Sequence, residues 1–152
     1  MGSINYSNLK IKKAVFSDIN KIMRIISLCT KHMISNKIFQ WDENYPSKNI
    51  FKEDIDKGYL MVLLLESDII GCVSVSNVMD DFYKKIEWKM ESNNSLYVHR
   101  LAINPQFQGK GYAKYVMSFI ENIGKKNKSK SVRLDTFSLN EKNNKFYSNI
   151  GY

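Results

Sequence analysis

Two different periods of apolar residues run along this chain, and they separate helices from strands. Between Ile19 and Met33 apolar side chains return every three or four residues, which is typical of a helix with one buried face. Short and nearly continuous apolar runs at 59–65, 69–75 and 96–103 are instead typical of buried strands. The pattern therefore predicts a chain that mixes both kinds of element.

The N-terminal part of the sequence predicts one strand followed by two helices. A loosely alternating stretch at 4–15 is expected to form the strand, and Ser17 or Asp18 is expected to cap the helix that comes after it. Ser47 opens a second helix and Gly58 ends it, since a small polar residue and a glycine are the usual helix boundaries.

A hairpin is expected next, because only three residues separate the runs 59–65 and 69–75. Residues 77–94 are polar, and their structure stays open at this stage. The two hairpin strands must be antiparallel, which makes the first part of the expected sheet antiparallel.

The C-terminal part predicts a parallel crossover. A strand at 96–103, a helix at 110–125 and a strand at 131–136 form a right-handed β-α-β unit, and a short helix follows at 140–150. The expected fold class is α/β of the α+β type, with a mixed, mostly antiparallel twisted sheet, one parallel crossover and helices on both faces.

Composition favours a folded globular protein without a membrane segment. The chain has 152 residues, 43% of them hydrophobic, and we expect a single domain over 1–152. No apolar run is long enough to cross a bilayer, and no secretory signal is recognisable, so we expect a cytoplasmic protein with no membrane partner. Cys29 and Cys72 stand among apolar neighbours and are expected to be buried thiols, without a disulfide or a metal site.

The net charge of +8 favours an anionic partner, such as a phosphorylated cofactor. Nucleic acid is the weakest candidate, because the only arginines are Arg24, Arg100 and Arg133 and the lysines are scattered.

A glycine-rich turn between the strand at 96–103 and the next helix carries the clearest chemical signal. Gly109 and Gly111 allow the backbone to approach an anion closely, and Lys110 adds positive charge. Unpaired N–H groups at the start of a helix can bind phosphate. An ordinary turn before a helix is the alternative interpretation.

Three blocks in fixed order resemble the GNAT family of N-acetyltransferases. The first block, Leu101-Ala102-Ile103-Asn104-Pro105, is similar to the family's Leu-Ala-Val-x-Pro. The second, Gln108-Gly109-Lys110-Gly111-Tyr112-Ala113, resembles its Gln/Arg-x-x-Gly-x-Gly/Ala signature. The third consists of Asn140, Asn143 and Phe146-Tyr147-Ser148-Asn149-Ile150-Gly151-Tyr152. Asn143 departs from the family's Ala, and the sequence stops at Tyr152, where the family has a last strand that we expect this sheet to lack.

The resemblance implies acetyl transfer from acetyl-CoA to a primary amine of a small molecule or a protein, without a metal. It implies that Tyr147 is the general acid that protonates the departing thiolate; a core tyrosine on the helix face is the alternative. The residues that it implies for cofactor binding are Leu101, Ala102, Ile103, Gln108, Gly109, Lys110, Gly111, Tyr112, Ala113, Asn140 and Asn143. A non-catalytic acyl-CoA-binding or sensor domain is the alternative, and a homodimer in which a neighbour completes the sheet is a further option.

The base that deprotonates the amine is less well defined by the sequence. His99 has a suitable ordinary pKa of about 6.5, although a histidine in a strand can equally be a packing residue. Glu87 is the second candidate, with a surface carboxylate as the alternative. Asp135 is the third, with local hydrogen bonding to the following loop as the alternative.

Two further groups of residues are open to more than one interpretation. Aromatic residues in irregular segments line an acceptor pocket or belong to the core, and we expect at least half of them in the core: Phe39, Trp41, Tyr45, Phe82, Tyr83 and Trp88. The lysine-rich run 125–130 is either a solvated loop or a contact for a CoA phosphate.

Overall fold

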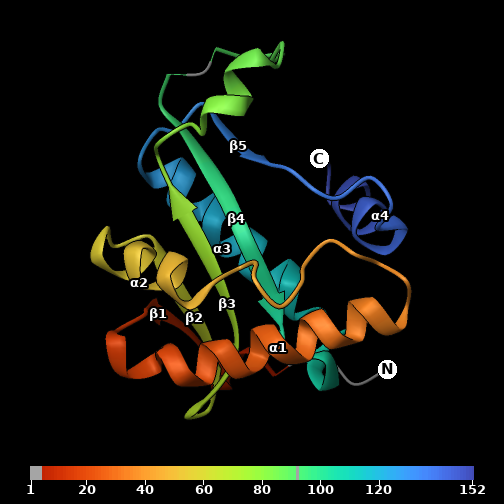
Figure 1. Cartoon of the computed structure of the whole chain (residues 1–152). Helices are drawn as coiled ribbons and strands as arrows, with labels where there is room; N and C mark the ends of the chain where they lie inside the picture. The colour runs from red at the N-terminus through yellow and green to blue at the C-terminus, as the bar shows by residue number, and fades with distance from the viewer. Residues whose placement is uncertain (1–4, 92) are drawn as a thin grey trace.

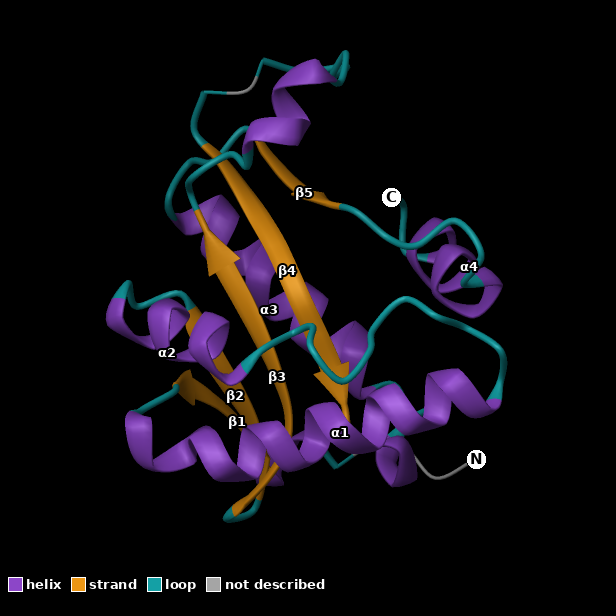
Figure 2. Ribbon diagram, viewed as in Figure 1, coloured by secondary structure: helices purple, strands orange, loops and turns teal. Residues whose placement is uncertain are grey.

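The computed structural model describes residues 5–91 and 93–152 and contains one five-stranded sheet (Figures 1 and 2). The strands lie in the order β1-β2-β3-β4-β5, and only the β4–β5 pair is parallel. The strands are β1 (Leu9–Lys13), β2 (Leu60–Leu65), β3 (Asp68–Ser76), β4 (Ser95–Ile103) and β5 (Ser131–Leu134). The helices are α1 (Ile19–Ser35), α2 (Lys48–Asp56), α3 (Tyr112–Lys126) and α4 (Glu141–Asn149). The mixed sheet and the predicted order of elements are confirmed.

The N-terminal strand is shorter than predicted. Of the expected range 4–15, Ile4 lies outside the described residues, and Tyr6–Asn8 form a turn of 3-10 helix before β1. The side chain of Asn5 accepts a hydrogen bond from the N–H of Ser7, and this local bond favours the turn over a strand. The segment left open at 77–94 contains another turn of 3-10 helix, at Asp81–Lys85.

The two predicted helix starts differ in how they are capped. Ser47 caps α2 as expected, since its hydroxyl accepts a hydrogen bond from the N–H of Ile50. Asp18 is the residue before α1, but its carboxylate accepts from the N–H of Val15 and so fixes the chain entering the helix. The α2 helix ends at Asp56, two residues before the predicted Gly58.

Helices cover both faces of the sheet (Figure 1). On one face α1 and α2 bury Ile22, Ile26 and Phe51 against the sheet, and no solvent reaches Ile22 or Phe51. On the other face α3 buries Val116 and Ile120. Burial of such side chains, at about 1.5–3 kcal/mol each, holds both layers on the sheet.

A bulge interrupts β4 at Arg100. Ser74 of β3 pairs with His99, and Cys72 pairs with Ala102. One residue of β3 between these pairs therefore lies opposite two residues of β4, Arg100 and Leu101. Arg100 has φ +53°, in the left-handed region that non-glycine residues rarely adopt.

The strands β4 and β5 separate just beyond this point. Their pairing ends at Val98 with Leu134, and the predicted strand residues Asp135 and Thr136 lie outside β5. Figure 2 shows the chain leaving the sheet after β5 and running to α4. The C-terminal half of β4 is therefore left without a strand neighbour on the β5 side, and this gap is where the site forms.

Within the described ranges, no helix combines the length and the apolar content needed to span a membrane.

Candidate active site

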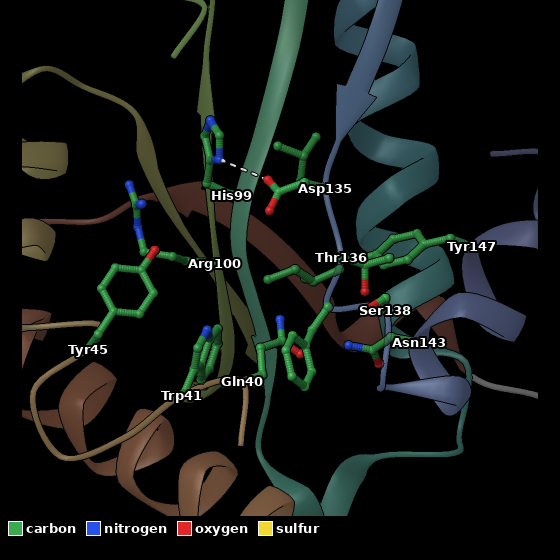
Figure 3. A pocket seen from close by; sticks show the side chains of 13 residues that line it. Gln40, Trp41, Tyr45, His99, Arg100, Asp135, Thr136, Ser138, Asn143 and Tyr147 are labelled. Carbon is green, nitrogen blue, oxygen red and sulfur yellow. Dashed lines mark ion pairs between the residues drawn. The ribbon is translucent and has the colours of Figure 1, made fainter. Parts of the chain in front are cut away.

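A cleft of about 480 Å³ occupies the gap between β4 and the chain that follows β5 (Figure 3). Four parts of the chain form its walls: the loop between α1 and α2, the middle of β4, the segment after β5, and α4. The lining residues are Gln40, Trp41, Tyr45, Val98, His99, Arg100, Leu101, Asp135, Thr136, Phe137, Ser138, Asn143 and Tyr147.

The free edge of β4 presents backbone groups to this cleft. The N–H of Asn104 donates to the carbonyl of Ile70 on β3, at 2.8 Å. Because backbone groups alternate sides along a strand, Ala102 also faces β3, and Leu101 and Ile103 face away from it. The backbone of Leu101, whose side chain lines the cleft, can therefore pair with an extended ligand.

The glycine-rich turn lies next to this edge. Gly109 and Gly111 have φ +75° and +89°, so both need the conformational freedom that glycine has. The N–H groups of residues 109–114 donate to no other group in the described part of the chain. The turn is exposed and opens α3, so these donors and the positive end of the helix dipole are available to an anion.

Gln108 has a role that the sequence did not indicate. Its Nε2 donates to the carbonyl of Ile103 at 2.9 Å, and its Oε1 accepts from Lys142 at 3.2 Å. The side chain thus ties the turn to the end of β4 and to α4, and it positions the turn while its polar atoms are already paired.

The two predicted asparagines are placed differently. Asn140 is buried, its Oδ1 accepts from the N–H of Asn143, and its Nδ2 donates to Gln40 at 3.1 Å. It therefore caps α4 and links this helix to the loop before α2. Asn143 lines the cleft, so its side chain is the one that can reach a ligand there.

Tyr147 projects from α4 into the cleft (Figure 3). Burial raises its pKa to about 12, and the nearby Asp135 charge adds to this shift. The phenol is therefore protonated at neutral pH and can donate a hydrogen bond.

His99 lies in the same cleft, between two carboxylates. Its Nδ1 is 3.9 Å from Asp135 Oδ1, and its Nε2 is 3.8 Å from Asp80 Oδ2. Tyr83 stacks on the imidazole and donates a hydrogen bond to Asp135. Burial is the largest influence on the pKa of His99 and lowers it. The charges of Asp80 and Asp135 raise this pKa and the charge of Arg100 lowers it, and the net shift is downward. The ring is therefore mainly neutral at neutral pH.

The structure does not bring Glu87 into the cleft, where it would be needed as a base. Glu87 is exposed and is not among the lining residues. Its neighbour Trp88 is held by a hydrogen bond to the carbonyl of Tyr83 and by the guanidinium of Arg133, which lies 4.1 Å from the ring centre. The carboxylate near His99 that the sequence analysis missed is Asp80, in the segment 77–94 that it left open.

The aromatic residues are less buried than predicted. Only Trp41 and Tyr83 of the six belong to the buried set, whereas Phe39, Tyr45 and Phe82 are exposed. Trp41 and Tyr45 line the cleft, in agreement with the pocket interpretation for the loop between α1 and α2. Most of these aromatic side chains stay exposed because they lie in connecting segments at the surface, where the backbone itself stays solvated.

The lysine-rich run 125–130 lies at the end of α3 opposite to the glycine turn. At about 1.5 Å per residue, the 15 residues of α3 separate the two by about 22 Å. Lys130 pairs with Glu91 and Asn93. This placement favours the solvated-loop interpretation.

Arg100 and Asp54 form an ion pair beside the cleft. Arg100 donates to Asp54 Oδ2 from Nε at 3.1 Å and from Nη2 at 2.5 Å. A charged residue within the apolar run 96–103 was the available signal, but nothing in the sequence indicated its partner on α2.

Two further observations concern the thiols and possible metal ligands. Cys29 and Cys72 are both buried, as predicted. Among the described residues, no three His, Cys, Asp or Glu side chains gather in a way that could hold a metal ion.

Together these groups suit an extended anionic ligand that carries a reactive carbonyl. The turn can bind its anionic end and the β4 edge its extended part. Tyr147 can donate to a leaving group, and His99 can accept a proton from a nucleophile.

Known proteins match this chain over most of its length. The sequence matches the model of the acetyltransferase (GNAT) family over residues 21–152. It is 21% identical over 141 residues to YesJ, an uncharacterized N-acetyltransferase of Bacillus subtilis (strain 168), with 91% of this chain and 78% of that protein covered.

Solved structures show the same fold. A GNAT-family acetyltransferase from Streptococcus agalactiae 2603 superposes with a TM-score of 0.79 at 25% identity, covering 95% of this chain and 84% of that one. An aminoglycoside acetyltransferase from an uncultured soil metagenomic sample, crystallised with sisomicin, superposes with a TM-score of 0.65 at 16% identity, covering 96% and 89%.

Proposed function

The chain belongs to the acetyltransferase (GNAT) family, and from this premise we propose that it transfers the acetyl group of acetyl-CoA to a primary amine of a small molecule or a protein. The observation that carries the proposal is the gap between β4 and β5, which brings a free strand edge and Tyr147 to one cleft. The glycine-rich turn is tied to the end of the same strand through Gln108.

The residues fit acetyl-CoA along its length. The unpaired N–H groups of 109–114 suit its pyrophosphate, with Lys110 adding charge. The backbone of Leu101 and Ile103 suits the amides of its pantetheine arm, as an added strand would. Asn143 is available to the same arm, whereas Gln108 and Asn140 contribute by positioning the turn and α4.

Acetyl-CoA, when bound, supplies the acetyl thioester; the amine nitrogen bonds to the acetyl carbon as the C–S bond breaks. One proton must leave the amine and one must reach the sulfur. Tyr147 can donate a hydrogen bond or its proton to that sulfur. Backbone N–H groups near the β4 bulge can stabilise the negative charge that develops on the carbonyl oxygen.

His99 is the base that we propose for the amine, because it is neutral at neutral pH and lies in the cleft between Asp80 and Asp135. The carboxylates stabilise the imidazolium that forms once His99 accepts a proton. Asp135 is exposed and adds negative charge to the cleft, which suits an ammonium-bearing acceptor.

The test is an acetyl-CoA assay against a panel of amines, read by thiol release and by mass spectrometry of the products. The panel includes aminoglycosides, because a structure of the same fold was crystallised with sisomicin, and also polyamines, amino acids and peptide amines. Acetylation of at least one amine supports the proposal. Tight binding of acetyl-CoA with no transfer across the panel would instead favour the non-catalytic acyl-CoA-binding domain.

A further inference from the structure

The bulge at Arg100 decides which backbone groups of β4 face the cleft. Before the bulge, Tyr97 and His99 pair with Ser76 and Ser74 and turn their backbone groups toward β3. An uninterrupted strand would next turn Leu101 and Ile103 toward β3. With Arg100 inserted, Ala102 and Asn104 take that direction, and Leu101 and Ile103 face the gap.

The same insertion sets the side chains. Val98 and Leu101 both pack on the α3 face although they are three residues apart, while His99 and Arg100 lie consecutively on the other face, toward α2 and Asp80. One extra residue thus directs the β4 edge toward the gap and places Arg100 on the same face as His99.

The conformation of this extra residue is unfavourable for an arginine. With φ +53°, its Cβ crowds its own backbone, and glycine or asparagine would adopt this conformation more readily. The surrounding structure must therefore hold Arg100 in place.

Asp54 of α2 supplies this restraint. Two nitrogens of the Arg100 guanidinium donate to one carboxylate oxygen, and only 15% of the Arg100 side chain and 8% of the Asp54 side chain are exposed. Tyr45 also acts on the guanidinium and helps to raise the pKa of Arg100, after the larger contribution of Asp54. Figure 3 shows Arg100 directed toward Tyr45, on the side of the cleft opposite to Tyr147.

We propose that the Asp54–Arg100 pair is a positioning device: it holds the β4 bulge, and the bulge turns the backbone of Leu101 and Ile103 toward the bound acyl donor. This inference rests on the proposed function, because it assumes that an acyl-CoA lies along β4. Arg100 acts here through the backbone, and its guanidinium does not need to touch either substrate.

The test compares two double variants that both lack the ion pair. Asp54→Asn combined with Arg100→Gly leaves no buried charge unpaired and places glycine where φ is positive. Asp54→Asn combined with Arg100→Ala differs from it by one methyl group that opposes this conformation. Wild type and Asp54→Asn alone complete the set.

The proposal expects the glycine variant to keep the KM for acetyl-CoA within about threefold of wild type, because glycine adopts the bulge unaided. The alanine variant should raise this KM by about tenfold, because the left-handed conformation is costly for alanine. The KM for the amine should change little in either variant. If the alanine variant fails to fold, Arg100→Asn and Arg100→Gln, each combined with Asp54→Asn, take the place of the glycine and alanine variants. Asparagine tolerates the left-handed conformation and glutamine does not.

KM values that stay near the wild-type value in both double variants would overturn the proposal, because the conformation of residue 100 would then be irrelevant. KM values raised equally in both would also overturn it, because the guanidinium itself would then be required. Calorimetric binding of coenzyme A gives the same comparison without turnover. If wild type binds coenzyme A but acetylates no amine, the proposed function fails, and the binding comparison still decides on the role of the pair.

Discussion

The Nδ1 atom of His99 lies 3.9 Å from the Oδ1 atom of Asp135, the residue that directly follows β5. This contact joins the two strands across the gap at the point where their pairing has ended. It also places the imidazole that lines the cleft beside the carboxylate whose charge raises the pKa of Tyr147.

The pH profile of acetyl transfer should depend on His99. Its pKa lies below the ordinary value of about 6.5, and only the neutral ring can accept a proton. We therefore expect kcat/KM to fall as the pH drops through a value below 6.5. The negative charge of Asp135 raises the pKa of His99. Asp135→Asn removes this charge and should therefore move the acidic limb to still lower pH.

Substitution separates this role from a structural one. His99→Gln should remove the acidic limb and lower kcat/KM by about 100-fold or more. His32→Gln is the matched control, because His32 is exposed on α1 and is not among the residues that line the cleft. The pH profile of His32→Gln should be that of wild type. A His99→Gln profile that keeps the limb would exclude His99 as the base.

Tyr147→Phe should lower kcat about 100-fold, because the phenol is the expected donor to the departing sulfur. The affinity for acetyl-CoA should stay near the wild-type value, because the turn and the β4 edge are intact. Since burial raises the pKa of Tyr147 to about 12, no alkaline limb from this residue is expected below about pH 10. Tyr115→Phe is the control, because it removes a hydroxyl from a residue that does not line the cleft. An unchanged kcat in Tyr147→Phe would exclude Tyr147 from the mechanism.

Gly111→Asp should abolish acetyl-CoA binding, because it places bulk and negative charge at the turn that we expect to hold the pyrophosphate. Gly58→Asp is the matched control: Gly58 also has a positive φ, of +71°, but lies between α2 and β2 and not in the turn before α3. Both variants should lose comparable stability, about 1 kcal/mol or somewhat more. Calorimetric titration with acetyl-CoA measures the difference, and equal affinities in the two variants would move the phosphate site elsewhere.

Gly71→Ala should destabilise the sheet next to the bulge. A Cβ at this position would lie 2.7 Å from both the Ala102 carbonyl oxygen and Ile103 Cδ1, which forces β3 and β4 apart. We expect a loss of about 1–3 kcal/mol in the free energy of unfolding, measured in urea. Gly124→Ala in α3 is the contrasting control, since its Cβ makes ordinary contact with Val132 at 3.5 Å and alanine favours a helix by up to about 1 kcal/mol.

The features that the sequence predicted best have local causes. Ser47 caps α2 because a serine before a helix can pair with its first free N–H groups, and Gly109 and Gly111 mark a turn because that backbone needs positive φ. The crossover from β4 to β5 follows from short apolar runs on either side of an amphipathic helix.

The features that it missed depend on contacts between distant parts of the chain. Arg100 gave no sign of a bulge, because its cause is the register against β3 and a carboxylate 46 residues away on α2. Asp80 reaches His99 because Tyr83 packs on Tyr97 and on His99, and this packing fixes a segment without periodicity. Glu87 had the right chemistry for a base, but spatial reach decides that role.

The two cysteines affect how such assays can be read. Cys29 of α1 and Cys72 of β3 belong to the buried cluster between α1 and the sheet. Burial raises the pKa of each thiol to about 12. A colorimetric reagent that captures thiolates would find almost none on the folded protein at neutral pH. The thiol signal from the enzyme itself is thus low, and a thiol signal that grows during turnover reports the liberated coenzyme. A thiol signal that appears only with heat or urea reports the opening of the core.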